Sequence, residues 1–239
     1  MMNVIITGAS RGIGRAIAEV FAAHGHALYL CSKNEVALYK TMEELLNKYP
    51  RSKIKAKARD LSKKEEVEKF GQWLLDNGIS IDVLVNNAGN FLPGSVHNEE
   101  KGVLEEMIAV NLYSAYHLTR MLLPVMMKQN IARGSRGHIF NMCSTASLSS
   151  YNNGGSYSIS KFALNGFSKN LREELKAYHI KVTAVFPGAV MTDSWGDYDN
   201  STNRIMEAND IAQMVFAAAQ LSPQACVEEI LIRPQLGDL

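Results

Sequence analysis

Short apolar runs alternate with longer amphipathic segments along the chain, and this alternation constrains the fold more than any other feature. The runs with the length of strands lie at 3–7, 27–31, 53–58, 83–86, 138–143, 181–186 and 228–233. The segments with the apolar spacing of helices lie at 13–24, 35–49, 63–77, 99–127, 157–178 and 209–221. Strands that alternate with helices form a parallel sheet with helices on both faces. We therefore expect an α/β protein, a doubly wound parallel sheet of about seven strands.

The length of 239 residues suits one domain over 1–239, because no linker, repeat or low-complexity tract divides the chain. Lysines alternate with apolar residues in the run 53–58, which is expected to be an edge strand in the order 3-2-1-4-5-6. The polar segment 193–207 interrupts the pattern after the sixth strand. Ligands bind beyond the carboxyl ends of strands in such sheets, so this segment is expected to be a substrate lid.

Charge and cysteine content argue against several kinds of partner. Lys+Arg total 25 and Asp+Glu total 24, a net charge of +1 that gives no basis for binding nucleic acid or a membrane surface. The three cysteines are far apart and show no ligand spacing, so we expect no metal and buried free thiols. No apolar stretch reaches the roughly 18 residues of a membrane span, and the N-terminus has no signal-peptide pattern. A cytoplasmic protein is expected.

A glycine-rich loop follows the first apolar run. Its spacing is G-x-x-x-G-x-G and it contains Gly8, Ser10, Arg11, Gly12, Ile13 and Gly14. Glycines let the backbone turn tightly and approach a pyrophosphate, which the free N–H groups of the next helix can bind. The loop lacks the Gly-Lys-[Ser/Thr] ending of a Walker sequence. Its position after the first strand predicts a nucleotide site in a doubly wound fold of the Rossmann type.

Tyr157 and Lys161 are four residues apart in a predicted helix, so both side chains lie on one helix face. A free phenol has a pKa of about 10 and is a poor proton donor at neutral pH. A nearby ammonium stabilises the phenolate and lowers this pKa. The pair is therefore a candidate general acid for a carbonyl oxygen.

The motifs resemble, in order and over nearly the whole chain, those of the short-chain dehydrogenase/reductase family. The matching positions are the glycine loop, Asn86-Asn87-Ala88-Gly89, Asn111, Ser144, Tyr157, Lys161 and Pro187-Gly188. The chain is similar to bacterial sepiapterin-reductase-like and 3-oxoacyl carrier-protein reductase-like members. The resemblance implies that the adenine and adenosine side of a cofactor meets Asp60, Leu61, Asn87, Ala88 and Gly89, and that its nicotinamide meets Pro187, Gly188, Val190 and Thr192.

The residues after the second strand favour NADP(H) over NAD. An NAD-selective site places an acidic residue there to bind the ribose 2′-hydroxyl. Ser32 stands at that position and Lys33 follows it, while Arg11 is a second cation in reach of a 2′-phosphate. Two alternatives stay open: Lys33 as a solvated loop lysine, and Glu35 as a ribose acceptor in a shifted register.

The resemblance also implies roles in catalysis. Ser144 would hold the substrate oxygen beside Tyr157, Lys161 would bind the nicotinamide ribose, and Asn111 would hold a proton-relay water. Ser144 could instead cap a turn, and Ser147, Ser149 and Ser150 are competing hydroxyls in the same loop. In the reduction, NADPH gives a hydride to the carbonyl carbon and Tyr157 gives the proton.

The substrate is less constrained by the sequence. Tyr151, Met191 and Trp195 are candidates for its pocket, and Trp195 could equally anchor the loop. We expect a small carbonyl compound, a ketone, a diketone or a pterin side chain. Alternatives are a 3-oxoacyl thioester, a non-catalytic NADP(H)-sensing protein, and an NAD-dependent alcohol dehydrogenase working oxidatively. Relatives imply a homodimer or homotetramer that packs through the helices at 99–127 and 157–178.

Overall fold

The computed structural model of the chain describes residues 1–130 and 134–238. Its main sheet has seven parallel strands in the order β3-β2-β1-β4-β5-β6-β9. The strands are β1 Asn3–Thr7, β2 Ala27–Ser32, β3 Ile54–Ala58, β4 Val83–Asn86, β5 Gly137–Met142, β6 Ile180–Pro187 and β9 Glu229–Ile232. The predicted doubly wound sheet is confirmed, with β3 at one edge.

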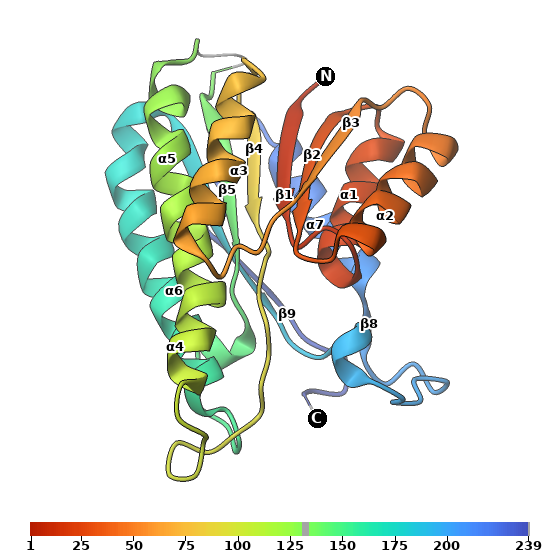
Figure 1. Cartoon of the computed structure of the whole chain (residues 1–239), viewed down its shortest axis with the longest axis vertical. Helices are drawn as coiled ribbons and strands as arrows, with labels where there is room; N and C mark the ends of the chain where they lie inside the picture. Colours follow the sequence, from red (N-terminus) through yellow and green to blue (C-terminus); the bar gives the residue numbers. More distant parts are fainter. Residues whose placement is uncertain (131–133, 239) are drawn as a thin grey trace.

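Helices cover both faces of the sheet (Figure 1). One face carries α1 Gly12–Ala23, α2 Glu35–Lys48 and α7 Ala208–Gln220. The other carries α3 Lys64–Asp76, α4 Val103–Ile108, α5 Ser114–Lys128 and α6 Gly155–Leu175. Alternate residues of β1 build the two cores: Val4 and Ile6 pack with α1 and α7, whereas Ile5 packs with α3 and α5. The continuous apolar run of this central strand follows from burial on both faces.

The predicted long helical region 99–127 is present, but it begins at Val103 and ends at Lys128. Gly102 has a φ of +92°, which is left-handed backbone, and α4 begins only after it. A π-helical segment, Ala109–Tyr113, then connects α4 to α5 without an interruption of the helix. Such a segment widens the helix by one residue and is common at functional sites. Neither the left-handed glycine nor the π-helical turn changes the apolar spacing, so periodicity alone could not locate them.

The cysteines agree only partly with the expectation of buried thiols. Cys31 and Cys143 are buried, and burial raises their pKa values to about 12 and about 11. Cys226 is exposed, because it lies in the connection between α7 and β9 and outside the two cores. Across the described residues, no helix is both long and apolar enough for a membrane span, and no cluster of His, Cys, Asp or Glu could hold a metal ion.

Candidate active site

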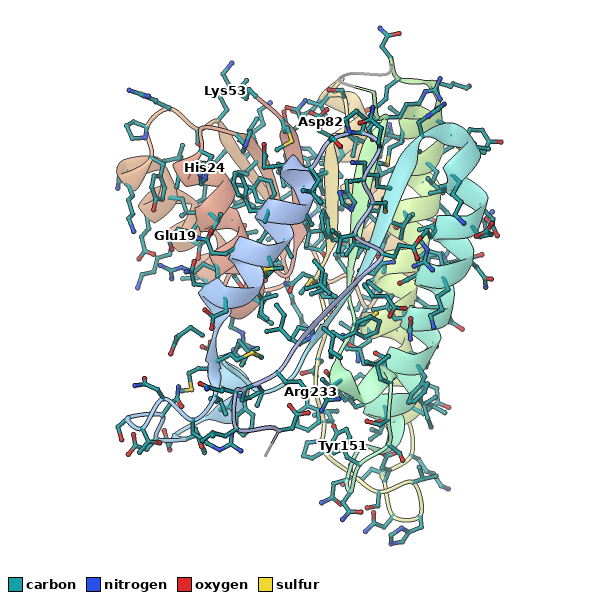
Figure 2. The ribbon with its side chains drawn as sticks, turned by 180° about the vertical axis from the view of Figure 1, so that it is seen from behind. Glu19, His24, Lys53, Asp82, Tyr151 and Arg233 are labelled. Carbon is teal, nitrogen blue, oxygen red and sulfur yellow. The ribbon has the colours of Figure 1, made fainter. Side chains whose placement is uncertain are left out.

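The sequence-predicted site residues gather at the carboxyl ends of the strands. Figure 2 shows Lys53 and Asp82 at the opposite end of the molecule, where strands begin, and Tyr151 and Arg233 at the end where the long loops lie. This end of a parallel sheet is the usual ligand side.

The glycine loop turns sharply from β1 into α1. Gly8 and Gly12 have φ values of +66° and +54°, which L side chains rarely adopt. Gly14 permits close packing, because a Cβ there would collide with the carbonyl oxygen of Gly8 and the amide of Asn87. Arg11 precedes α1 without a side-chain hydrogen bond to its first turn. The first N–H groups of α1 therefore receive no cap from Arg11, an arrangement that suits an anion.

Thr7 connects this loop to the end of β4, and sequence reasoning missed it as a site residue. Its Oγ1 accepts hydrogen bonds from the backbone N–H groups of Asn87 at 3.0 Å and Ala88 at 2.9 Å. In return, Asn87 Nδ2 donates to the carbonyl oxygens of Thr7 at 2.9 Å and Gly8 at 3.1 Å. A threonine that ends a strand is the only sequence signal for this role.

The predicted 2′-phosphate residues lie at the ends of β2 and β3. Ser10 Oγ and Ser32 Oγ are 2.8 Å apart, so the two hydroxyls share one hydrogen bond. Lys33 Nζ forms an ion pair with Asp60 Oδ2 at 3.0 Å. Partial burial would raise the pKa of Asp60, but hydrogen bonds from Ser62 and Lys33 outweigh it and hold this pKa below its usual value. The carboxylate of Asp60 therefore holds the ammonium of Lys33 at the ends of β2 and β3.

Glu35 and Leu61, which were also predicted near the cofactor, each have a role in the fold. Glu35 lies in the first turn of α2, where a carboxylate is favoured by the helix dipole. Leu61 is 5% exposed and packs in the core with Val67 and Phe70. Its side chain is therefore part of the core, and its contact with an adenine ring stays a prediction.

Tyr157 and Lys161 lie in α6, and the lysine is fixed. Lys161 is 6% exposed, and its ammonium donates a hydrogen bond to the carbonyl oxygen of Met142 at 2.8 Å. The same ammonium is 5.7 Å from the centroid of the Tyr157 ring. Phe91 packs edge-on against that ring, with centroids 4.9 Å apart. Phe91 is a second residue that sequence reasoning missed, since an isolated phenylalanine in a loop carries no signal.

Ser144 follows β5 and caps the short 3-10 helix Thr145–Ser147. Its Oγ accepts from the N–H of Ala146 at 3.2 Å, and its own N–H donates to Ser147 Oγ at 3.1 Å. The capping alternative is therefore correct, yet it uses only a lone pair of the Ser144 hydroxyl. The proton of that hydroxyl can still be donated to a substrate. Ser147 is consumed as the capping partner and is buried.

Asn111 lies in the π-helical segment and holds the chain that follows β4. Its Oδ1 accepts from Asn90 N–H at 2.8 Å, and its Nδ2 donates to Asn90 O at 3.0 Å and Ser160 Oγ at 2.9 Å. Gly89 lies between Asn111 and Lys161, because a Cβ there would be 3.0 Å from Asn111 Oδ1 and 3.6 Å from Lys161 Nζ. The structure thus brings the predicted proton-relay pair to one place.

The segment after β6 returns to the glycine loop. Pro187 ends β6, and Gly188 N–H donates to the carbonyl oxygen of Ile232 at 2.8 Å. A Cβ on Gly12 would be 3.2 Å from Thr192 Cγ2, so Thr192 lies against the loop. Val190 is buried in the short strand β7 Val190–Met191.

The predicted lid, 193–207, contains a short helix and a short strand. It begins with the 3-10 helix Asp193–Trp195 and ends in β8 Met206–Glu207, which pairs with β7. Arg204 ties it to the C-terminal turn by donating to the carbonyl oxygen of Gly237 at 2.9 Å.

The three predicted substrate residues do not share one cavity among those described. Trp195 packs on Tyr198 with ring centroids 5.2 Å apart, as expected of an anchor within its loop. Tyr151 lines a cavity of about 530 Å³ with Val96, Ile159 and Phe162, and neither Met191 nor Trp195 lines it. Burial, with a smaller contribution from the charge of Tyr157, raises the pKa of Tyr151 to about 12. Tyr151 is therefore neutral at physiological pH and can act as a hydrogen-bond donor.

Comparison with known proteins agrees with this geometry. The pattern of the short chain dehydrogenase family matches residues 2–203. An uncharacterised oxidoreductase of Staphylococcus saprophyticus is 31% identical over 238 residues, which cover 96% of both chains. An alcohol dehydrogenase from the archaeon Thermococcus sibiricus, complexed with 5-hydroxy-NADP, has a TM-score of 0.89 at 28% identity over 98% of this chain and 97% of that one.

A metagenomic short-chain oxidoreductase in complex with NADP has a TM-score of 0.83 at 32% identity, over 98% of this chain and 97% of that one. The similarity extends over almost the full length of these proteins, and the predicted strand order is present. The chain therefore belongs to the short-chain dehydrogenase/reductase family of oxidoreductases.

Proposed function

We propose that this oxidoreductase reduces a small carbonyl compound to an alcohol with NADPH as the cofactor. The observation that carries the proposal is the placement of Lys161, whose ammonium is held by Met142 O and lies 5.7 Å from the Tyr157 ring. This placement sets a cation beside the phenol that would donate the proton to a carbonyl oxygen as general acid. Ser144, at the end of β5, supplies the second hydroxyl.

The residues present fit a dinucleotide that carries a 2′-phosphate on its ribose. The positive φ values of Gly8 and Gly12 and the close approach at Gly14 form a turn that only glycine tolerates, next to the start of α1. Arg11 and Lys33 supply positive charge for a 2′-phosphate, and Ser32 supplies a hydroxyl. Of the two solved structures compared above, the metagenomic oxidoreductase is in complex with NADP and the Thermococcus sibiricus alcohol dehydrogenase with 5-hydroxy-NADP.

The cofactor supplies the hydride when it is bound, and the chain supplies the rest of the chemistry. Ser144 orients the carbonyl oxygen by donating a hydrogen bond. Tyr157 donates its phenolic proton to the same oxygen as negative charge develops there. Lys161 stabilises the phenolate that Tyr157 becomes. Asn111, whose amide lies beside Gly89 and Lys161, would hold the water that returns the proton.

The test is NADPH oxidation with a panel of ketones, diketones, sepiapterin and short 3-oxoacyl thioesters. Tyr157→Phe should lower kcat by about 10²- to 10⁴-fold, the usual contribution of a general acid, and leave NADPH binding intact. Tyr178→Phe, the same change at an exposed tyrosine beyond α6, is the matched control and should leave turnover unchanged. Unchanged turnover in Tyr157→Phe would refute the mechanism. Tight NADPH binding without turnover across the panel would indicate a cofactor-sensing protein instead.

We also propose a homodimer that packs through α5 and α6. Ile159 and Phe162 on α6 are 44% and 46% exposed, and Tyr113, at the end of the π-helical segment before α5, is 50% exposed. Exposed apolar side chains on neighbouring helices are typical of a subunit interface. Light scattering with Phe162→Glu should show monomers where the unaltered protein shows dimers, and a monomeric unaltered protein would contradict the proposal.

A further inference from the structure

The segment 90–99, which follows β4, is attached to the region around Tyr157 at separate points. At its beginning, the side chain of Asn111 binds both the N–H and the carbonyl oxygen of Asn90. In its middle, Gly94 N–H donates to Asn153 O at 3.1 Å, and Ser95 Oγ donates to Asn153 Oδ1 at 2.9 Å. Asn153 lies just before α6, so these bonds bring the segment to the start of that helix.

Glu99 makes the last attachment, and it does so through its carboxylate. Oε1 accepts a hydrogen bond from the backbone N–H of Ser156 at 2.8 Å, and Oε2 accepts one from Ser156 Oγ. The residue that precedes α6, Gly154, has no side chain with which to cap the helix. Glu99 therefore satisfies an N–H group of the first turn that would otherwise have no partner within the helix.

The residues around Glu99 leave space for its carboxylate and hold its backbone in place. A Cβ on Gly155 would collide with Glu99 Oε1, so glycine at this position leaves the room that the carboxylate needs. The backbone of Glu99 is fixed in turn, because its N–H donates to Ser95 O at 3.0 Å. Hydrogen bonds from the side chain and then the backbone of Ser156 hold the pKa of Glu99 below its usual value. Glu99 is thus an anion at the positive end of the helix dipole at neutral pH.

Tyr157 is the residue directly after Ser156, and the same segment touches it a second time. Phe91 packs against the Tyr157 ring with an interplanar angle of 82°. The segment therefore fixes the backbone of the first turn through Glu99 and the phenol ring through Phe91.

We propose that Glu99 is a positioning residue for Tyr157, acting through Ser156 and through the segment that carries Phe91. The inference rests on the proposed function, since it concerns the proton donor of that reaction. Without Glu99 the first turn of α6 loses its cap, and Tyr157 gains freedom to move away from the substrate oxygen. A displacement of about 1 Å can lower a rate by roughly 100-fold.

The first experiment compares Glu99→Ala, Glu99→Gln and Glu100→Ala. Glu100 is the adjacent exposed acid, so Glu100→Ala makes the same charge change and should leave kcat unchanged. Glu99→Ala should lower kcat by about 10- to 100-fold and leave the Kd for NADPH within about twofold. Glu99→Gln should recover most of kcat, because its amide oxygen can still accept from Ser156 N–H. Equal kcat in Glu99→Ala and the unaltered protein, or no recovery in Glu99→Gln, would overturn the proposal.

The second experiment measures amide hydrogen exchange in peptides that cover 90–99 and 155–161. Glu99→Ala should accelerate exchange in both, and Ser156→Ala, which keeps the backbone bond to Glu99, should accelerate it less. This readout needs no turnover, so it separates failure of the positioning role from failure of the proposed reduction. Unchanged exchange in Glu99→Ala would overturn the anchoring. Faster exchange with an unchanged kcat would overturn the role in positioning Tyr157.

Discussion

Arg11, in the glycine loop, and Asp193, which is 182 positions later and opens the segment 193–207, form an ion pair of 3.2 Å between Nη1 and Oδ2. Both side chains are more than half exposed. The pair spans the place where β1 ends and the chain leaves β6, and so it links the predicted cofactor loop to the predicted lid. Arg11 is also a predicted partner of a 2′-phosphate, so Asp193 and the phosphate compete for one guanidinium.

Asp193→Asn should therefore tighten NADPH binding. An exposed ion pair contributes up to about 1 kcal/mol, so the Kd for NADPH should fall by about two- to fivefold at low salt. The gain should shrink as salt rises, because exposed charges are screened. Fluorescence titrations with NADPH and NADH at two salt concentrations measure the effect. NADH lacks the 2′-phosphate, and equal tightening for both cofactors would contradict the competition.

Lys33→Ala should weaken NADPH binding and leave NADH binding unchanged. A hydrogen bond to a charged group contributes about 1.5 to 3 kcal/mol, which corresponds to a rise in Kd of tenfold or more. Lys33 also balances the carboxylate of Asp60, and its loss leaves that anion facing the phosphate. The matched control is Lys53→Ala, which removes an exposed lysine at the far end of the sheet (Figure 2). The same Kd for NADPH in Lys33→Ala and the unaltered protein would rule out this role.

The layered fold could be predicted because buried strands and helices have characteristic spacings of apolar residues in the sequence. Val4, Ile5 and Ile6 are each fully buried, as a central parallel strand between two helical layers requires. The start of the helical region at Val103 and its π-helical turn could not be predicted in this way. A left-handed glycine, Gly102, sets the start, and neither feature changes the apolar spacing.

The candidate site was predictable where a motif fixes each residue type at its place along the chain, as for Gly14, Asn87 and Lys161. It was not predictable where two polar residues meet across a long sequence separation. Glu99 and Ser156 are 57 positions apart, and Arg11 and Asp193 are further apart still. Such pairs follow from the packed arrangement of loops and carry no periodic signal. Thr7 and Phe91 were missed for the same reason.

Thr7→Val should destabilise the fold at the junction of β1 and β4. Valine has nearly the same shape but no oxygen, so the N–H of Ala88 would lose its acceptor, while Asn87 N–H would keep its bond to Val85 O. A fully buried N–H without a partner costs about 1 to 3 kcal/mol of the free energy of unfolding, and Ala88 is part-buried, so we expect a loss of about 1 kcal/mol. Urea denaturation measures this loss. Thr7→Ser retains the hydroxyl and is the matched control, and equal stability of the two variants would show that the hydrogen bonds contribute nothing.

His138 should make the free energy of unfolding depend on pH. It is 5% exposed in β5, its Nε2 lies 2.7 Å from Thr183 Oγ1, and its ring stacks on Phe140. Burial, with a smaller effect from the charge of Lys181, lowers its pKa from 6.5 to about 3. Between these two values the unfolded chain binds a proton at His138 and the folded chain does not. The stabilisation is therefore complete above pH 6.5 and is lost as pH falls toward 3.

The loss from His138 alone should approach about 1.4 kcal/mol per pH unit within that window. Urea unfolding from about pH 7 down to about pH 5 measures the slope. His138→Phe removes the titrating group and should flatten the profile, whatever its stability at neutral pH. The same change at the exposed His97 should leave the slope as it is, because that side chain faces solvent and is not packed in the core. A slope that survives His138→Phe would mean that other groups, chiefly carboxylates, carry the acid sensitivity, and the assignment to His138 would be wrong.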